Sequence, residues 1–416
     1  MKLSIKHYSQ NERLVLCLFI CPYILPSLVE LLSLPTFIKY FFDFVWAFLL
    51  LTMITRKKNT CYSDTKIIKC IVLSYFAYTV LNYLLHYQSL FYYLWGFRNT
   101  FRGLVLFFSV IYYLKTEDAI VCLNVLDKLF YINAIIALIQ FGVLGYRQDN
   151  LGGIFGVQPG CNGALNIYLC IMLVIYYMKY LNKKISTARL CFNFLIMLLI
   201  AAAGEIKFFY VEFVIILVLA SLITGFSIKR LAIIIIALVI LSYGYRFFIN
   251  IFPDTNLSLE YLINYAQSDT GYSVSGGISR GTFFSFINNR FLTTPIDRLF
   301  GLGLGNCDYA SGVDLLTSPF YLKNGYTRYD WFSGSLLYLE NGICGLVLYL
   351  LFIVVNVVLL LKNKNIPKEL SNVSILCSIV FVIVLFYNNS LKVESAYMIF
   401  FVLALPWTSS KEGRLK

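Results

Sequence analysis

Residues 336–361 read LLYLENGICGLVLYLLFIVVNVVLLL and carry one charged side chain, Glu340. A transmembrane helix needs about 20 mostly apolar residues, so this stretch is long enough to span a bilayer. Its Leu, Ile, Val and Phe residues form a continuous run without the alternation typical of membrane β-strands. The stretch therefore predicts a membrane-spanning helix.

Similar apolar runs recur along the whole chain, which has 416 residues, of which 59% are hydrophobic and 13% charged. Soluble globular proteins are about a quarter charged, so this composition excludes a soluble enzyme or a nucleic-acid-binding protein and indicates a lipid bilayer as the surroundings. We predict an all-α polytopic integral membrane protein that forms one domain, 1–416, with about twelve transmembrane helices. The predicted spans are 14–32, 37–54, 67–87, 100–114, 119–141, 161–179, 190–205, 208–225, 231–250, 336–361, 372–388 and 396–407.

The Lys and Arg residues between these spans predict the orientation of the chain. With twelve spans, the basic clusters at 2–13, 56–58, 179–189, 362–368 and 411–416 all fall on one side. The positive-inside rule makes that side the cytoplasm, with both termini in it. The connection 251–335 then lies outside the cytoplasm and contains ten of the 25 glycines. Loops much longer than about 15 residues are usually functional, so we expect the chemistry on the outer face.

The outer connections are enriched in arginine, with eight Arg against three Lys, whereas the cytoplasmic flanks have five Arg and sixteen Lys. The planar guanidinium group binds the oxygens of a phosphate or carboxylate in pairs, which Lys does not do. This bias indicates recognition of a phosphate, a diphosphate or acidic sugars. The alternative is that these arginines form ion pairs with acidic residues of the same face.

Charged residues within the predicted spans have local explanations. Lys39 lies four residues before Asp43, and Asp127 is next to Lys128, so we expect each pair to neutralise itself. Glu212 has no comparable neighbour, and an ionisable residue inside a membrane is by default a functional hypothesis. The eleven cysteines are scattered without a CxxC pair, and the sequence predicts no metal and no cofactor.

Three stretches resemble the polytopic O-antigen and capsular-polysaccharide polymerases and the related O-antigen ligases. The first is GISR at 277–280, followed by PIDRLFGLGLG at 295–305, with Arg290 spaced before the glycine run. The second is YLENGICG at 338–345, and the third is AGEIK at 203–207, where Lys207 stands in place of the family's usual Arg. The resemblance implies a GT-C-like membrane glycosyltransferase in the bacterial cytoplasmic (inner) membrane.

The chain departs from the ligases at one position. Ligases carry a His shortly before the Glu-x-Gly motif, and here that place falls near Trp331, beside Asp330. The only histidines are His7 and His86. The resemblance therefore favours a polymerase over a ligase.

The resemblance implies that the enzyme joins undecaprenyl-diphosphate-linked repeat units into O-antigen, capsule or exopolysaccharide at the outer face of the membrane. A chain-length regulator and a flippase of the same pathway are candidate partners. Fixed cations near the leaving diphosphate would stabilise the transition state. We predict as catalytic residues Arg280, Arg290, Lys207 and Asp330, and as substrate-binding residues Arg98, Arg102, Arg147, Arg298, Arg328 and Glu340.

Several of these residues have structural alternatives. Arg98, Arg102 and Arg147 could reach lipid phosphates, and Glu340 could interact with a helix dipole. Asp330, a candidate general base, could pair with Arg328 or cap the following helix. At the level of the whole protein, the alternatives are a ligase and a flippase or other transporter, although the absence of visible repeats and the single large outer loop argue against transport.

Overall fold

The computed structural model describes residues 8–55, 65–225, 228–251 and 277–409, and within these ranges it contains helices but no strands. Every one of the twelve predicted segments lies on a helix. The long helices are α1 (Gln10–Leu31), α2 (Phe41–Thr55), α3 (Lys66–His86), α4 (Leu90–Tyr113), α5 (Thr116–Gly142), α6 (Cys161–Leu181), α7 (Thr187–Ala203), α8 (Lys207–Thr224), α9 (Ile228–Ile251), α14 (Ser333–Lys362), α15 (Lys368–Tyr387) and α16 (Ala396–Thr408).

Nine helices in the described part of the chain are long and apolar enough to cross a membrane. Large apolar side chains on their outer faces are exposed, for example Phe44 (75%) on α2 and Leu85 (61%) on α3. Such surfaces are stable in lipid and not in water. The protein is therefore an all-helical polytopic membrane protein. The other three long helices are α4, which carries two arginines, and the shorter apolar helices α7 and α16.

The fourth predicted span, 100–114, begins too late. Helix α4 starts at Leu90, and residues 90–99, which we expected in a connection, form its first turns. The apolar pattern ends there because of Arg98, Asn99 and Arg102. These side chains are compatible with a buried helix because carboxylates from other segments pair with both arginines.

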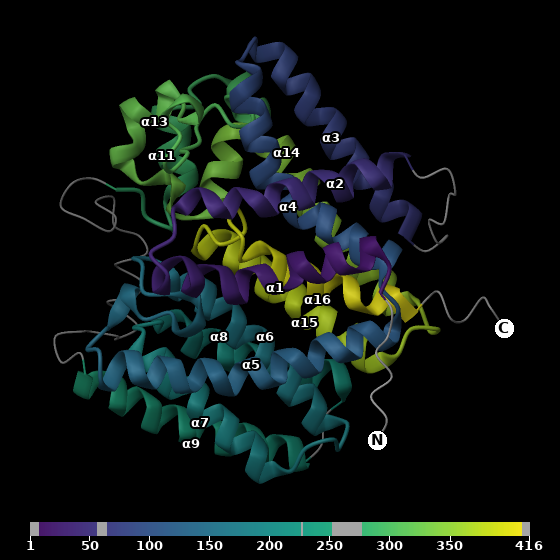
Figure 1. Cartoon of the computed structure of the whole chain (residues 1–416), viewed down its shortest axis with the longest axis vertical. Coiled ribbons are helices and arrows are strands. Elements are labelled where there is room, and N and C mark those ends of the chain that lie inside the picture. The colour runs from purple at the N-terminus through teal and green to yellow at the C-terminus, as the bar shows by residue number, and fades with distance from the viewer. Residues whose placement is uncertain (1–7, 56–64, 226–227, 252–276, 410–416) are drawn as a thin grey trace.

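Helices α6 and α16 form the centre of the bundle (Figure 1). All residues of α16 from Ala396 to Thr408 are buried, and so are the residues of α6 from Leu165 to Met178. Helix α16 packs against α4 and α15. Its apolar side chains are therefore covered by protein and not by lipid, which explains why 13 residues suffice for this helix.

The two sides of the bundle differ (Figure 1). Helix α1 begins and α16 ends on one side, at the right of the view, whereas α11 (Phe283–Arg290) and α13 (Pro319–Asn324) lie on the opposite side, at the upper left. These short helices and α12 (Pro295–Phe300) belong to the connection between α9 and α14. Of the predicted large loop 251–335, residues 252–276 lie outside the described residues, and residues 333–335 belong to α14.

Candidate functional site

A cavity of about 250 Å³ lies where four separate segments meet. The segments are η1 (Thr36–Tyr40), the first half of α4, the connection before α14 together with the first turn of α14, and the 388–395 connection between α15 and α16. Because η1 follows α1 and 388–395 precedes α16, the cavity lies on the same side of the bundle as α11 and α13. Its polar and aromatic lining includes Lys39, Tyr40, Trp95, Arg98, Asn99, Asp308, Tyr309, Asp330, Lys392 and Glu394.

A break in helix α14 positions one wall of this cavity. Gly342 has φ 61° and ψ −168°, a conformation that essentially only glycine adopts. The 301–305 run lies against this break, where the N–H groups of Leu302 and Gly303 donate to the carbonyls of Leu339 (2.9 Å) and Glu340 (2.8 Å). A Cβ atom on Gly301 would collide with the α14 backbone. The glycine run therefore allows the 301–305 backbone to pack closely against α14, and this packing places Asp308 at the cavity.

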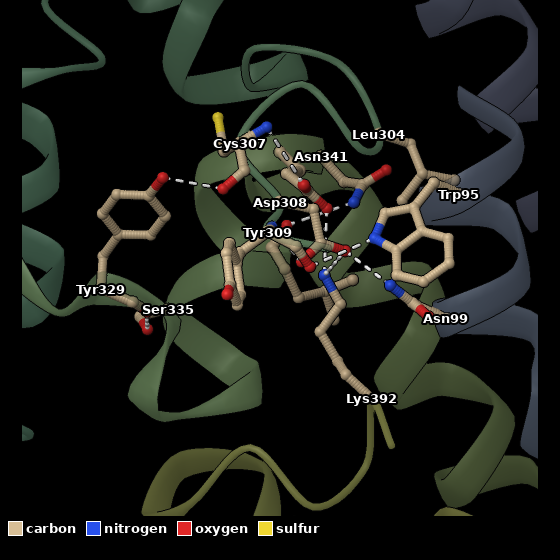
Figure 2. A network of polar contacts seen from close by, with 12 residues as sticks. Trp95, Asn99, Leu304, Cys307, Asp308, Tyr309, Tyr329, Ser335, Asn341 and Lys392 are labelled. Atoms are coloured by element: carbon tan, nitrogen blue, oxygen red, sulfur yellow. Dashed lines mark hydrogen bonds and ion pairs between the residues drawn. The ribbon is translucent and has the colours of Figure 1, made fainter. Parts of the chain in front are cut away.

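Lys392 joins the two acidic groups beside this break (Figure 2). Its Nζ lies 3.3 Å from Asp308 Oδ2 and 3.3 Å from Glu340 Oε2. Asn99 Nδ2 donates to the same oxygen of Asp308 at 2.9 Å. Burial lowers the pKa of Lys392, but the carboxylates of Asp308 and Glu340 raise it more, so that its net pKa is raised. The ammonium group is thus held in its charged form.

A second group of ion pairs surrounds Arg98 and Arg102. Arg98 donates from Nε and Nη2 to the two oxygens of Asp43, at 2.9 and 2.7 Å. Arg102, of which 1% is exposed, pairs with Glu394 at 2.9 Å. Burial would raise the pKa of Glu394, but Arg102 and Arg98 lower it to about 2. Glu394 is therefore ionised and tied to both arginines.

Among the described residues, Asp330 is the lining carboxylate that forms no ion pair, although the charge of the nearby Arg328 acts on it. Tyr321 Oη donates to its Oδ2 at 3.5 Å, and its buried Oδ1 has no hydrogen-bond partner among the described residues. Burial raises the pKa of Asp330 to about 6. At neutral pH this carboxylate is mostly ionised, yet basic enough to accept a proton, which are the properties of a general base.

Aromatic rings form the rim of the cavity. The Nε1 of Trp95 donates to the carbonyl of Tyr309 at 3.3 Å, which ties α4 to the loop (Figure 2). Tyr40 Oη donates to the carbonyl of Ser311 at 3.0 Å. The guanidinium of Arg98 lies 4.7 Å from the ring centre of Trp95. The rim is therefore held by hydrogen bonds and a cation–π contact.

Of the predicted site residues, Arg98 and Asp330 line the cavity, while Glu340 and Arg102 lie buried behind its wall. The other six residues have different surroundings and do not line it. Three of them donate hydrogen bonds: Arg280 to the carbonyl of Tyr387 (2.8 Å), Arg290 to Tyr326 Oη, and Arg298 to the carbonyl of Leu292 (3.0 Å). Lys207 forms an ion pair with Glu205 (3.0 Å). Arg147 lies over the ring of Phe141, and Arg328 lies over the ring of Trp331.

Both ion pairs that we expected between sequence neighbours within the spans are wrong. Asp43 pairs with Arg98 instead of Lys39. Asp127 pairs with Arg189 (3.1 Å) and Lys179 (3.9 Å) instead of Lys128. Side chains on neighbouring helices are closer than sequence neighbours, and only the fold reveals which helices these are.

Sequence reasoning missed four polar residues of the site, Asn99, Asp308, Lys392 and Glu394. One signal pointed to the last two, because both lie in a short connection between two apolar spans on the predicted outer side. Asp308 lies three residues after the glycine run but has no distinguishing spacing. In the described part of the chain, no group of three His, Cys, Asp or Glu residues is placed to hold a metal ion.

No protein-family model and no curated protein matches this chain.

Proposed function

We propose that this protein polymerises undecaprenyl-diphosphate-linked oligosaccharide repeat units at the outer face of a bacterial cytoplasmic membrane. In this proposal all twelve long helices cross the membrane in a GT-C-like arrangement, with both termini in the cytoplasm. The observation that supports it is the cavity on the side opposite the start of α1 and the end of α16, with an aromatic rim and a carboxylate, Asp330, that forms no ion pair among the described residues. The motif resemblance supplies the substrate class.

The proposed reaction transfers a glycan from one lipid carrier to a sugar on another. The oxygen of the attacking sugar hydroxyl forms a bond to the anomeric carbon of the other glycan. The bond between that carbon and the diphosphate oxygen breaks, and its electron pair leaves with undecaprenyl diphosphate. Asp330 accepts the hydroxyl proton, and Arg280, Arg290 and Lys207 are the proposed contacts of the departing diphosphate.

Deletion of the gene tests the proposal through the surface glycan. We expect single repeat units in place of long chains, because assembly and export continue without polymerisation. The wild-type gene should restore the chain-length distribution, and Asp330→Asn should not, although the variant reaches the membrane in equal amount. Long polymer that stays on the lipid carrier would indicate a ligase, and repeat units trapped inside the cell would indicate a flippase.

The Arg290→Lys variant tests the proposed diphosphate contact. It keeps the charge and removes the planar fork, so we expect clearly shorter chains. Chain lengths like those of the wild type at equal protein level would contradict bidentate binding by Arg290.

One observation favours transport as a second candidate function. Helix α14 is interrupted at Gly342, next to the buried Glu340 and its partner Lys392. Discontinuous helices with buried charges are typical of the binding sites of secondary transporters. The deletion experiment separates the two, because a transporter is needed before any repeat unit reaches the surface.

A further inference from the structure

The charges around the cavity identify the kind of ligand that it can hold. The arginine bias of the outer face predicts an anionic ligand, and Arg98 is one of the arginines expected to bind it. The guanidinium of Arg98 is, however, occupied by both oxygens of Asp43 and by Asn99 Oδ1 at 2.7 Å. An anion would have to displace the Asp43 carboxylate before it could bind Arg98.

The second cation of the lining is neutralised in the same way. Lys392 lies between Asp308 and Glu340, with 10% of its side chain exposed. Lys39 is the remaining lining cation, and the charge of the nearby Arg328 offsets that of Asp330 on the loop. When the partners Asp43, Glu340, Arg102 and Arg328 are included, the cavity is surrounded by five carboxylates and five cations. The site therefore has no excess positive charge to attract an anion.

The uncharged features of the cavity suit a sugar ring. Trp95, Tyr40 and Tyr309 line the cavity with aromatic rings, while Asn99, Asp308 and Asp330 offer amide and carboxylate groups for hydroxyls. A volume of about 250 Å³ is below the roughly 300–1,000 Å³ of pockets for drug-sized ligands. The cavity therefore has room for about one sugar residue.

We infer that this cavity is a subsite for a single uncharged sugar residue and does not accept uronic acids or the diphosphate. The inference rests on the proposed function and makes it more specific, because the sugar held here carries the attacking hydroxyl next to Asp330. The diphosphate of the other substrate must then bind outside the cavity.

Matched pairs of monosaccharides test this directly. The full-length protein in lipid nanodiscs is mixed with the methyl glycosides of glucose, galactose and mannose, or with their C6-carboxylate counterparts, at pH 7.5. Binding is measured by saturation-transfer difference NMR. Repulsion by Asp308 and Asp330 should weaken each uronate roughly tenfold or more relative to its parent hexose. A uronate that binds as tightly as its hexose, or no binding in any of the three pairs, contradicts the inference.

Two variants locate the bound sugar. Trp95→Leu should remove most of the hexose signal, whereas Tyr146→Leu, an exposed aromatic residue outside the cavity, should leave it unchanged. Asp330→Asn should reduce the difference in affinity between hexose and uronate, because the variant lacks one charge that repels the uronate. Hexose binding that survives Trp95→Leu, or an unchanged difference in Asp330→Asn, would place the sugar elsewhere and overturn the inference.

The binding test and the deletion test can fail separately. Selective hexose binding in a protein whose deletion leaves chain length intact would remove the polymerase proposal and keep the sugar subsite. Tight uronate binding in a protein whose deletion abolishes polymer would remove the inference of an uncharged-sugar subsite and keep the polymerase proposal.

Discussion

At the scale of single residues, Lys392 connects two carboxylates that come from different segments of the chain. Asp308 lies on the connection between α9 and α14, and Glu340, which is 0% exposed, lies at the break of α14. Two such acids close together in a buried place are stable as ions only when a cation lies between them. Lys392 therefore holds the loop, α14 and the 388–395 connection together at the cavity.

The Lys392→Met variant should strongly destabilise the protein. Removing one partner of a buried ion pair leaves an uncompensated charge and costs about 3–5 kcal/mol. The matched control is Lys184→Met, because Lys184 pairs with Glu369 while 57% of its side chain is exposed, and exposed pairs contribute about 0–1 kcal/mol. Thermal unfolding in detergent measures both, and equal losses in the two variants would contradict the role given to Lys392.

Asp330 should make the stability of the protein fall with rising pH. Its folded-state pKa of about 6 lies above its ordinary value of 3.8. The protonated acid is therefore favoured in the folded state, and this contribution is complete below about pH 4 and lost as pH rises through 6. Asp330→Asn resembles the protonated form, so the variant should match wild type near pH 4 and be on the order of 1–3 kcal/mol more stable at pH 8.

Glu394 provides the control of opposite sign. Its folded-state pKa of about 2 lies below its ordinary value of 4.5, so its contribution is present above about pH 4.5 and is lost as pH falls towards 2. Glu394→Gln should therefore destabilise the protein at pH 6 and at pH 8. Unfolding temperatures at pH 4, 6 and 8 test both variants, and a lower stability of Asp330→Asn at pH 8 would contradict the assignment for Asp330.

The sequence identified the residue types of the site better than their positions. Arg98 and Asp330, two of the predicted site residues, line the cavity, and their predicted roles stay predictions; the arginine bias gave no information about pairing. Asp43, which forms the ion pair with Arg98, lies 55 residues away from it in the chain. Ion pairs between distant segments depend on helix packing, and no periodicity or spacing encodes them.

At the scale of helices, the existence of the long apolar helices was predictable, and their interruptions were not. Continuous apolar runs indicate spans regardless of their neighbours. The start of α4 at Leu90 and the break of α14 at Gly342 both depend on groups supplied by other segments. At the break, Asn82 of α3 donates to the carbonyl of Phe300 at 2.7 Å, and Tyr78 donates to that of Asn341 at 2.5 Å.

The Gly342→Ala variant tests the break in α14. An alanine there would have to adopt the glycine-only conformation, and its Cβ would collide with the backbone of Leu299. We expect a loss of about 2–4 kcal/mol together with faster proteolysis of the loop that contains α12. Gly142→Ala, at an exposed helix end with open space around the new Cβ, should have almost no effect. Similar stability of both variants would mean that the break in α14 does not contribute to the stability of the protein.

At the scale of the whole molecule, the side of the bundle on which the cavity lies decides which orientation in the membrane the proposed function requires. The cavity lies on the side of the bundle opposite the start of α1 and the end of α16 (Figure 1). An enzyme that joins glycans on exported lipid carriers needs this side to face outwards, and the basic clusters between the spans predict the same orientation.

Labelling of single introduced cysteines decides the orientation. Asp314→Cys places an exposed thiol on the connection between α9 and α14, and Lys364→Cys places one on the connection between α14 and α15, on the opposite side of the bundle. A membrane-impermeant maleimide should label Asp314→Cys in intact cells and Lys364→Cys only after permeabilisation, with the native cysteines of the unmodified chain as background. The reverse pattern would turn the cavity towards the cytoplasm and exclude polymerisation at the outer face, whereas labelling of both in intact cells would contradict the two-sided arrangement itself.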